Sequence, residues 1–371
     1  MAYRTSVGGL PRLQIERFPI RTSESYPLPI RVNHLHQVFR TVASAVAIVG
    51  LSGCSASPVD TPPPTITPAQ AAVSPPATGS PAGSVRSLSD RAIAAAFDAK
   101  TSSLAVLSPK SAEKSEITVL GEFDGARAVP LPGPVTAMTG DDEGRLYVST
   151  RGGYFRVDLA EQLATRVEVD GQHDTDFTAI ARREDGRLVL GSADGTVLTL
   201  SSESAVGAQL KIFARVDDLV TLGNTTVVLD RGQTSVTALS EDGTEDEHAL
   251  RAGEGATTLA ADDAGRVLVA DTRGGQLLVY GINPLILRQA FPVREAPYGL
   301  AGSSTLVWVS QTATNAVVGY DLSTGIPVEK VRYPTVQQPN SLVYDETSGT
   351  LYVVSGAGAG VQVIPGAAVG S

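Results

Sequence analysis

The chain has few side chains that could carry out covalent or acid–base chemistry. Among its 371 residues there are one Cys and four His. His173 and His248 stand among acidic residues and are predicted to be exposed, and no Gly-X-Ser-X-Gly nucleophile motif accompanies them. The lone thiol, Cys54, excludes a disulfide framework and a zinc site built from several cysteines. The chemistry available to this chain is therefore that of one sulfur atom and of polar groups that the fold brings together.

An uncharged apolar segment, residues 41–51, lies shortly before Cys54. It is much shorter than the roughly 20 residues that span a bilayer, and Arg31 and Arg40 precede it. This pattern is typical of the hydrophobic region of an export signal, so residues 1–53 are predicted to be a signal peptide. A start at Val32 would give that signal an ordinary length, and residues 1–31 would then lie upstream of the true start.

The segment Leu51-Ser52-Gly53-Cys54 resembles the lipobox of bacterial lipoproteins. The resemblance implies that Leu51, Ser52 and Gly53 are recognised by the signal peptidase, and that the sulfur of Cys54 carries a diacylglyceryl group with acyl chains such as palmitate. Cleavage would make Cys54 the amino terminus of a protein held by its lipid on the extracytoplasmic face of the cell membrane. The alternative is a buried helix that ends in Gly-Cys. The Ala-, Gly- and Val-rich, Lys-poor composition resembles that of actinobacterial, mycobacterial-type proteins.

A low-complexity segment follows the Cys. Eight of the 30 residues from 55 to 84 are Pro, most of the others are Ala, Ser or Thr, and Asp60 is the only charged residue. Such a composition cannot bury a core and favours extended, partly polyproline chain. Residues 54–84 are therefore predicted to be the lipidated Cys and a disordered linker.

A short apolar strand recurs beyond residue 85, at steps of 38 to 45 residues. Its seven copies begin at Leu104, Leu146, Leu188, Thr226, Val267, Leu306 and Leu351. Three copies follow an acid-X-Gly-Arg or acid-Gly-Arg turn, and each repeat has room for four short antiparallel strands. That is the size of a β-propeller blade, so residues 85–366 are predicted to form an all-β, seven-bladed propeller, with residues 367–371 as a tail.

The last repeat contains only three strands, which end at 361–364. The missing outer strand is predicted to come from residues 85–88, just before the first blade, because a ring closed by strands from both ends leaves no open edge. Six or eight blades would require one repeat to be miscounted.

Two sequence patterns resemble the NHL and YVTN groups of bacterial propellers. These are Asp-X-Gly-Arg-Leu-Tyr-Val at 142–148 and the segment from Asn315 to Gly325. The resemblance extends over about residues 90–365 and implies a fold but no particular activity. The single Trp, Trp308, excludes the repeated Trp of quinone-dependent propellers and is expected in the core.

The innermost strand of a propeller blade begins at the mouth of the central channel, where ligands of such proteins usually bind. Among the residues at these strand starts we select Asp176, Tyr298 and Asn340 as candidates for the channel rim. Residues 338–341 resemble an Asn strand of the gluconolactonase-like propellers, which hold a divalent cation. Asp176 and Asn340 supply only two side-chain oxygens, whereas Ca²⁺ takes six to eight ligands, so no metal site and no catalytic residue are assigned.

The sequence thus favours a non-catalytic binding or scaffold protein of the cell envelope, without a cofactor. Its expected partners are the membrane, through the lipid, and envelope proteins, and the chain is expected to be a monomer. A net charge of −10 argues against nucleic acid as a partner. Two alternatives stay open: a metal-dependent hydrolase or lactonase that uses the channel, and a cell-wall or sugar binder, which the aromatic content of 5% disfavours.

Overall fold

The computed structural model describes residues 64–88, 90–121 and 125–369. The predicted signal peptide, with Leu51, Ser52, Gly53 and Cys54, and the first part of the predicted linker lie outside these residues. Within the described part of the chain, no helix has the length and apolar character needed to cross a bilayer.

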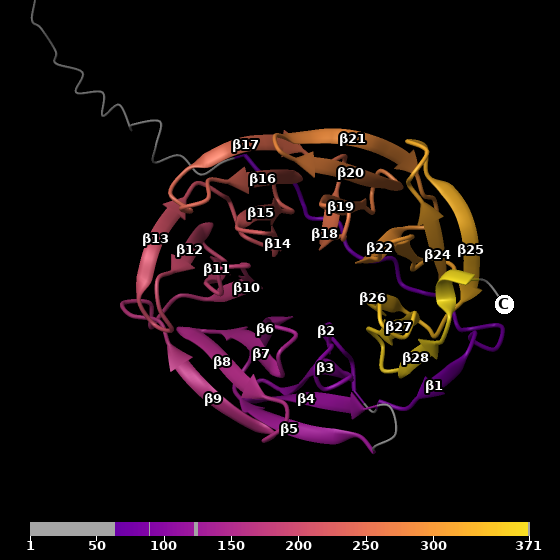
Figure 1. The fold of residues 1–371 in the computed structure, drawn as a ribbon, viewed down its shortest axis with the longest axis horizontal. Helices are drawn as coiled ribbons and strands as arrows, with labels where there is room; N and C mark the ends of the chain where they lie inside the picture. The colour runs from indigo at the N-terminus through magenta and orange to yellow at the C-terminus, as the bar shows by residue number, and fades with distance from the viewer. Residues whose placement is uncertain (1–63, 89, 122–124, 370–371) are drawn as a thin grey trace, which may run out of the picture. The chain divides into compact units, whose positions relative to one another are not determined.

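The described residues form seven four-stranded antiparallel sheets arranged as blades around a central channel (Figure 1). We number the blades from one to seven along the chain. From the channel outward, blade one consists of β2 (Ala94–Asp98), β3 (Ser103–Ser111), β4 (Lys114–Gly121) and β5 (Arg127–Pro132), and blade two of β6 (Val135–Gly140), β7 (Arg145–Thr150), β8 (Gly153–Asp158) and β9 (Leu163–Glu168). Blade three consists of β10 (Phe177–Arg182), β11 (Leu188–Ser192), β12 (Thr196–Leu200) and β13 (Val206–Lys211), and blade four of β14 (Asp218–Leu222), β15 (Thr225–Asp230), β16 (Ser235–Leu239) and β17 (Asp246–Arg251). Blade five consists of β18 (Ala256–Ala261), β19 (Arg266–Asp271), β20 (Gln276–Ile282) and β21 (Leu285–Pro292), and blade six of β22 (Pro297–Gly302), β23 (Val307–Gln311), β24 (Ala316–Asp321) and β25 (Val328–Pro334). The predicted seven-bladed propeller is confirmed.

The seventh blade takes its strands from both ends of the propeller. Its three inner strands are β26 (Pro339–Asp345), β27 (Thr350–Ser355) and β28 (Val361–Ile364), and its outer strand is β1 (Ser84–Arg86). β1 pairs antiparallel with β28, with Val85 opposite Gln362. This is the predicted closure, and a short 3-10 helix, η2 (Ala367–Val369), ends the described chain.

The recurrent apolar motif forms the second strand of each blade, and the turn before it explains the repeated Gly. Gly144, Gly186 and Gly265 all have positive φ, which Gly adopts without steric cost. In two of these turns the carboxylate that binds the turn amides is Asp141 or Asp262, one residue earlier than the acids of the sequence motif. The turn is therefore of the predicted kind, but a different acid stabilises it.

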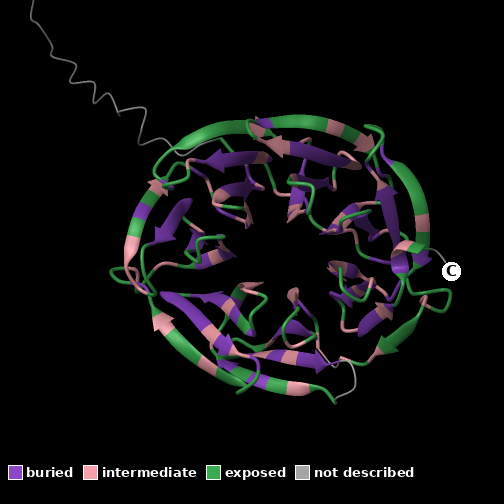
Figure 2. Cartoon of the chain, in the orientation of Figure 1, coloured by how far each residue is buried: buried purple, intermediate pink, exposed green. Residues whose placement is uncertain are grey.

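The core consists of seven apolar clusters, one at each contact between neighbouring blades. The second and third strands are buried on both faces, whereas the outer strands are mostly exposed (Figure 2). Each blade therefore buries its apolar faces only by packing between two others.

Trp308 shows this packing at the contact between blades six and seven. Its side chain is fully buried, and its ring stacks on Tyr344 with 5.9 Å between ring centroids. The expectation that Trp308 is a core residue is confirmed.

Residues 64–83 do not behave as the disordered linker that their composition predicts. We call this segment the strap. It lies along blades four to seven on the channel-mouth side, and Figure 1 shows it in indigo passing β18 and β22 before it reaches β1. Ile66 N donates to Gly232 O at 2.7 Å, and the hydroxyl of buried Ser74 donates to Thr312 O at 2.5 Å. The strap carries no apolar core of its own; turns of the blades bind its backbone.

Substitution of the buried Trp should destabilise the ring because it opens a cavity between two blades. We expect Trp308→Ala to lower the free energy of unfolding by about 3–5 kcal/mol in urea denaturation. Ile326→Ala is the control, since its side chain is 68% exposed and the change should stay within about 0.5 kcal/mol. Equal unfolding midpoints for the two variants would contradict this packing.

Candidate binding site in the central channel

The central channel contains a cavity of about 570 Å³ that is lined by all seven blades. The first strands of the blades supply most of its wall, and much of that wall is polar. Its size falls within the range of cavities that hold small ligands. Tyr298 and Asn340, two of the three residues selected from the sequence, line it.

Much of the polar wall serves to join the blades. The hydroxyl of Thr136 donates a hydrogen bond to Phe177 O at 2.7 Å and so joins blade two to blade three. Thr178 and Thr258 make the corresponding bonds to the next blade, with Val216 O and Tyr298 O as acceptors. These hydroxyls are structural, because each one satisfies a backbone carbonyl of the neighbouring sheet.

Blade four has a carboxylate, Asp218, where these blades have a Thr. Asp218 accepts hydrogen bonds from Leu219 N at 2.9 Å and from Leu259 N, in blade five, at 3.1 Å. It thus joins two blades by accepting an amide hydrogen, whereas the Thr residues donate to a carbonyl. Desolvation in the channel raises the pKa of Asp218 to about 6, although these two amides act in the opposite direction.

Asp217 and Arg231 lie beside Asp218 and also line the cavity. Asp217 accepts from Arg231 N at 2.8 Å and from Arg215 Nε at 3.0 Å. Arg231 donates through Nη2 to Ala69 O of the strap, but its buried Nε has no acceptor among the described residues. An unpartnered N–H on a side chain that lines a cavity is a group that a bound ligand can satisfy.

Tyr298 and Asn340 complete this set on blades six and seven. Desolvation raises the pKa of Tyr298, an effect that Arg231 reduces and Asp218 increases. Asn340 Oδ1 accepts from Gln338 Nε2 at 3.0 Å. We refer to Asp217, Asp218, Arg231, Tyr298 and Asn340 as the mouth cluster.

The third residue selected from the sequence, Asp176, lies apart from the mouth cluster. It does not line the cavity, its side chain is 60% exposed, and it pairs with Arg151 at 3.4 Å. His173 and His248 are exposed, as predicted, and neither lines the cavity.

Within the described ranges, no three His, Cys, Asp or Glu side chains come together as a potential metal site. The mouth cluster has two carboxylates, one guanidinium, one phenol and one amide. It can exchange hydrogen bonds with a polar ligand, and its Asp218 can gain or lose a proton near neutral pH.

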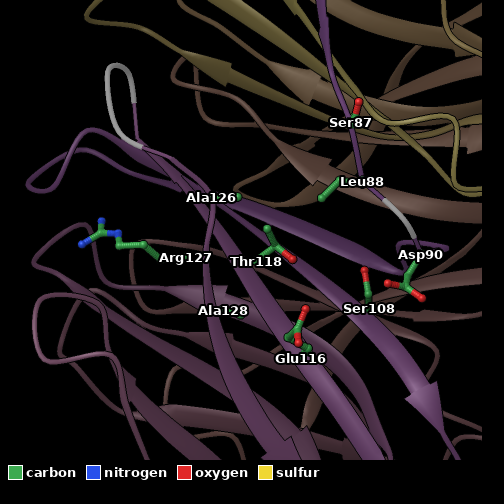
Figure 3. Close-up of a pocket in the computed structure, with 9 residues that line it drawn as sticks. All are labelled: Ser87, Leu88, Asp90, Ser108, Glu116, Thr118, Ala126, Arg127 and Ala128. Atoms are coloured by element: carbon green, nitrogen blue, oxygen red, sulfur yellow. The ribbon is translucent and has the colours of Figure 1, made fainter.

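A second, smaller cavity of about 190 Å³ lies on blade one, near the link from β1 to β2 (Figure 3). Asp90 and Glu116 line it, and both pair with Lys110, which is 2.9 Å from Glu116. Arg127 points away from these acids in Figure 3. Since both of its acids already pair with Lys110, this cavity is the weaker candidate.

One feature of the sequence points to two residues of the mouth cluster that the sequence analysis did not select. Asp217-Asp218 is a pair of acids at a strand start, whereas the starts of the other first strands have at most one acidic residue. Arg231 had no such signal, because it comes from the turn after the second strand and reaches the channel only in the folded ring.

The ring is similar to several solved propellers. A streptogramin B lyase structure has a TM-score of 0.62 at 9% identity, over 75% of this chain and 96% of the other. A virginiamycin B lyase from Staphylococcus aureus has a TM-score of 0.61 at 11% identity, over 74% and 94%. A chain of a mitotic checkpoint complex has a TM-score of 0.63 at 12% identity, over 80% of this chain and 98% of the other. No protein-family model and no curated protein sequence matches this chain. At these identities the likeness shows the fold and no activity.

The raised pKa of Asp218 can be measured directly. We expect its carboxyl to titrate near pH 6 in carbon-detected NMR, assigned with Asp218→Asn, whereas its ordinary value is 3.8. Because the folded value is the higher one, Asp218 favours folding fully below about pH 4 and loses that contribution as the pH rises through about 6. Asp242 is the control, since hydrogen bonds from Ser240 and Thr244 lower its pKa to about 2. A midpoint for Asp218 at or below 3.8 would show that the channel is not a desolvating environment.

Proposed function

We propose that this chain is a lipid-anchored, non-catalytic binding protein of the bacterial cell envelope, and that it binds a polar ligand at the mouth cluster. The propeller supplies a rigid ring, and the lipobox-like segment before Cys54 supplies the anchor. The observation that carries the binding role is the buried Arg231 Nε, which lacks an acceptor among the described residues beside the carboxylates of Asp217 and Asp218.

The chemistry of the cluster indicates what the ligand must offer. Arg231 Nε lacks a hydrogen-bond acceptor, whereas the carboxylates of Asp217 and Asp218, which already accept two hydrogen bonds each, can accept more from a ligand that carries donors. A ligand that carries both, such as a polyhydroxylated compound or a peptide segment, fits this arrangement. The placement of His173 and His248 outside the cavity supports binding over acid–base catalysis by a His.

The anchor is tested by substitution of the only Cys. We expect full-length protein from bacterial membranes to have a mass that starts at Cys54 and includes diacylglyceryl, and to incorporate labelled palmitate. Cys54→Ala should lose the lipid and leave the membrane fraction, because the acyl chains supply the membrane affinity. Ser55→Ala, next to the anchor, should behave as wild type. An unlipidated, full-length wild-type chain would refute the anchor.

The binding site is tested by photo-cross-linking in intact cells. A photoreactive phenylalanine analogue in place of Tyr298 should yield a defined adduct, because this side chain faces the cavity. The matched control places the analogue at Leu163, which is 55% exposed on an outer strand, where no such adduct is expected. Adducts at Leu163 and none at Tyr298 would move binding to the rim of the ring.

A further inference from the structure

The strap shortens the chain that can separate the propeller from a lipid on Cys54. From its composition, the whole of residues 55–84 would act as a spacer. In the structure, however, Ile66 is already hydrogen-bonded to Gly232 of blade four. The residues between Cys54 and Ile66 span at most about 40 Å when fully extended.

The strap is held at many points, so its attachment does not depend on one contact. Arg273 Nη2 donates to Thr67 O at 2.6 Å, and Gln338 Nε2 donates to Ala72 O at 2.9 Å. Ser74 N donates to Gln338 Oε1 at 3.0 Å, and Asn315 Nδ2 donates to Pro75 O at 2.8 Å. Side chains of blades five to seven thus bind backbone groups that would otherwise be left to water.

All of these contacts lie at one end of the ring. They come from turns between second and third strands and from links between successive blades, at 230–235, 271–276, 311–316 and 334–339. The first strands begin at this same end, which carries the mouth cluster. We call it the mouth face. The chain therefore enters the propeller on the mouth face, at blade four.

The charge on the two ends of the ring differs. The opposite face carries the acidic turns at 141–143, 184–185 and 241–247. Asp185 pairs with Arg183 and Arg187, whereas the turn at 241–247 has five acidic residues and no basic one. The mouth face beside the strap carries both signs, as in the pair of Arg215 and Asp217 at 3.0 Å. An anionic membrane surface repels the opposite face more strongly than the mouth face.

Resting on the proposed lipid anchor, we infer that the strap turns the mouth face toward the bilayer, so that the channel opens onto the headgroup surface of the membrane. The short tether and the charge of the opposite face favour the same orientation. The ligand of the mouth cluster is then a molecule met at the membrane surface, within reach of the anchor.

The orientation is measured by energy transfer in vesicles of phosphatidylcholine and phosphatidylglycerol that contain an acceptor-labelled lipid. Lipidated full-length protein would carry a donor dye at Glu254→Cys, on the mouth face, or at Glu245→Cys, on the opposite face. Both residues are exposed acids, so the two variants are matched in charge, and acylated Cys54 does not react. We expect severalfold higher transfer from position 254. Equal or reversed transfer would overturn the inference.

Two further measurements separate the possible causes. Insertion of a long Gly/Ser segment between residues 63 and 64 leaves the strap untouched and should reduce the difference in transfer, and an unchanged difference would show that the strap does not orient the ring. Hydrogen exchange should find the amides of Ile66 and Ser74 protected, and rapid exchange at both would overturn the short tether.

The intact mass of the protein is recorded before these measurements. Loss of the lipid on Cys54 would defeat the proposed function, whereas lipidated protein with equal transfer defeats this inference alone.

Discussion

Each blade of this protein is apolar on both faces, and the rest of the structure depends on that constraint. The second strands, such as β15 and β19, are buried along almost their whole length. A single blade would therefore expose two apolar faces, and the chain can bury them only by surrounding every blade with two others. A closed ring follows, and β1 completes it by pairing with β28, so that strands from both ends of the propeller are held in one blade.

Closure of the ring also determines which polar groups line the channel. The first strands meet around the axis, and there Thr136, Thr178 and Thr258 use their hydroxyls to bind carbonyls of the next blade. Blade four departs from this pattern, because Asp218 brings a carboxylate with a raised pKa into the wall. Blade four is therefore the part of the channel wall where a titratable carboxylate replaces the neutral hydroxyl of the neighbouring blades.

The strap is ordered for a reason that composition does not reveal. Its residues are mostly Pro, Ala, Ser and Thr and have little apolar surface to bury, so the local composition predicts disorder. Its backbone carbonyls nevertheless find donors in Arg231, Arg273 and Gln338, which belong to three different blades. The ring thus supplies a prearranged row of donors that no stretch of the strap sequence encodes.

The sequence by itself determined the all-β class, the seven blades, their order of strands and the closure, because each blade repeats a period that depends only on local turns and on a short apolar strand. It also indicated Tyr298 and Asn340, since strand starts can be located from the same period. Only the tertiary structure decided that Arg231 joins them beside Asp217 and Asp218 and that Asp176 lies apart. The physical reason is that these groups come from different strands and turns, which meet only when the ring closes.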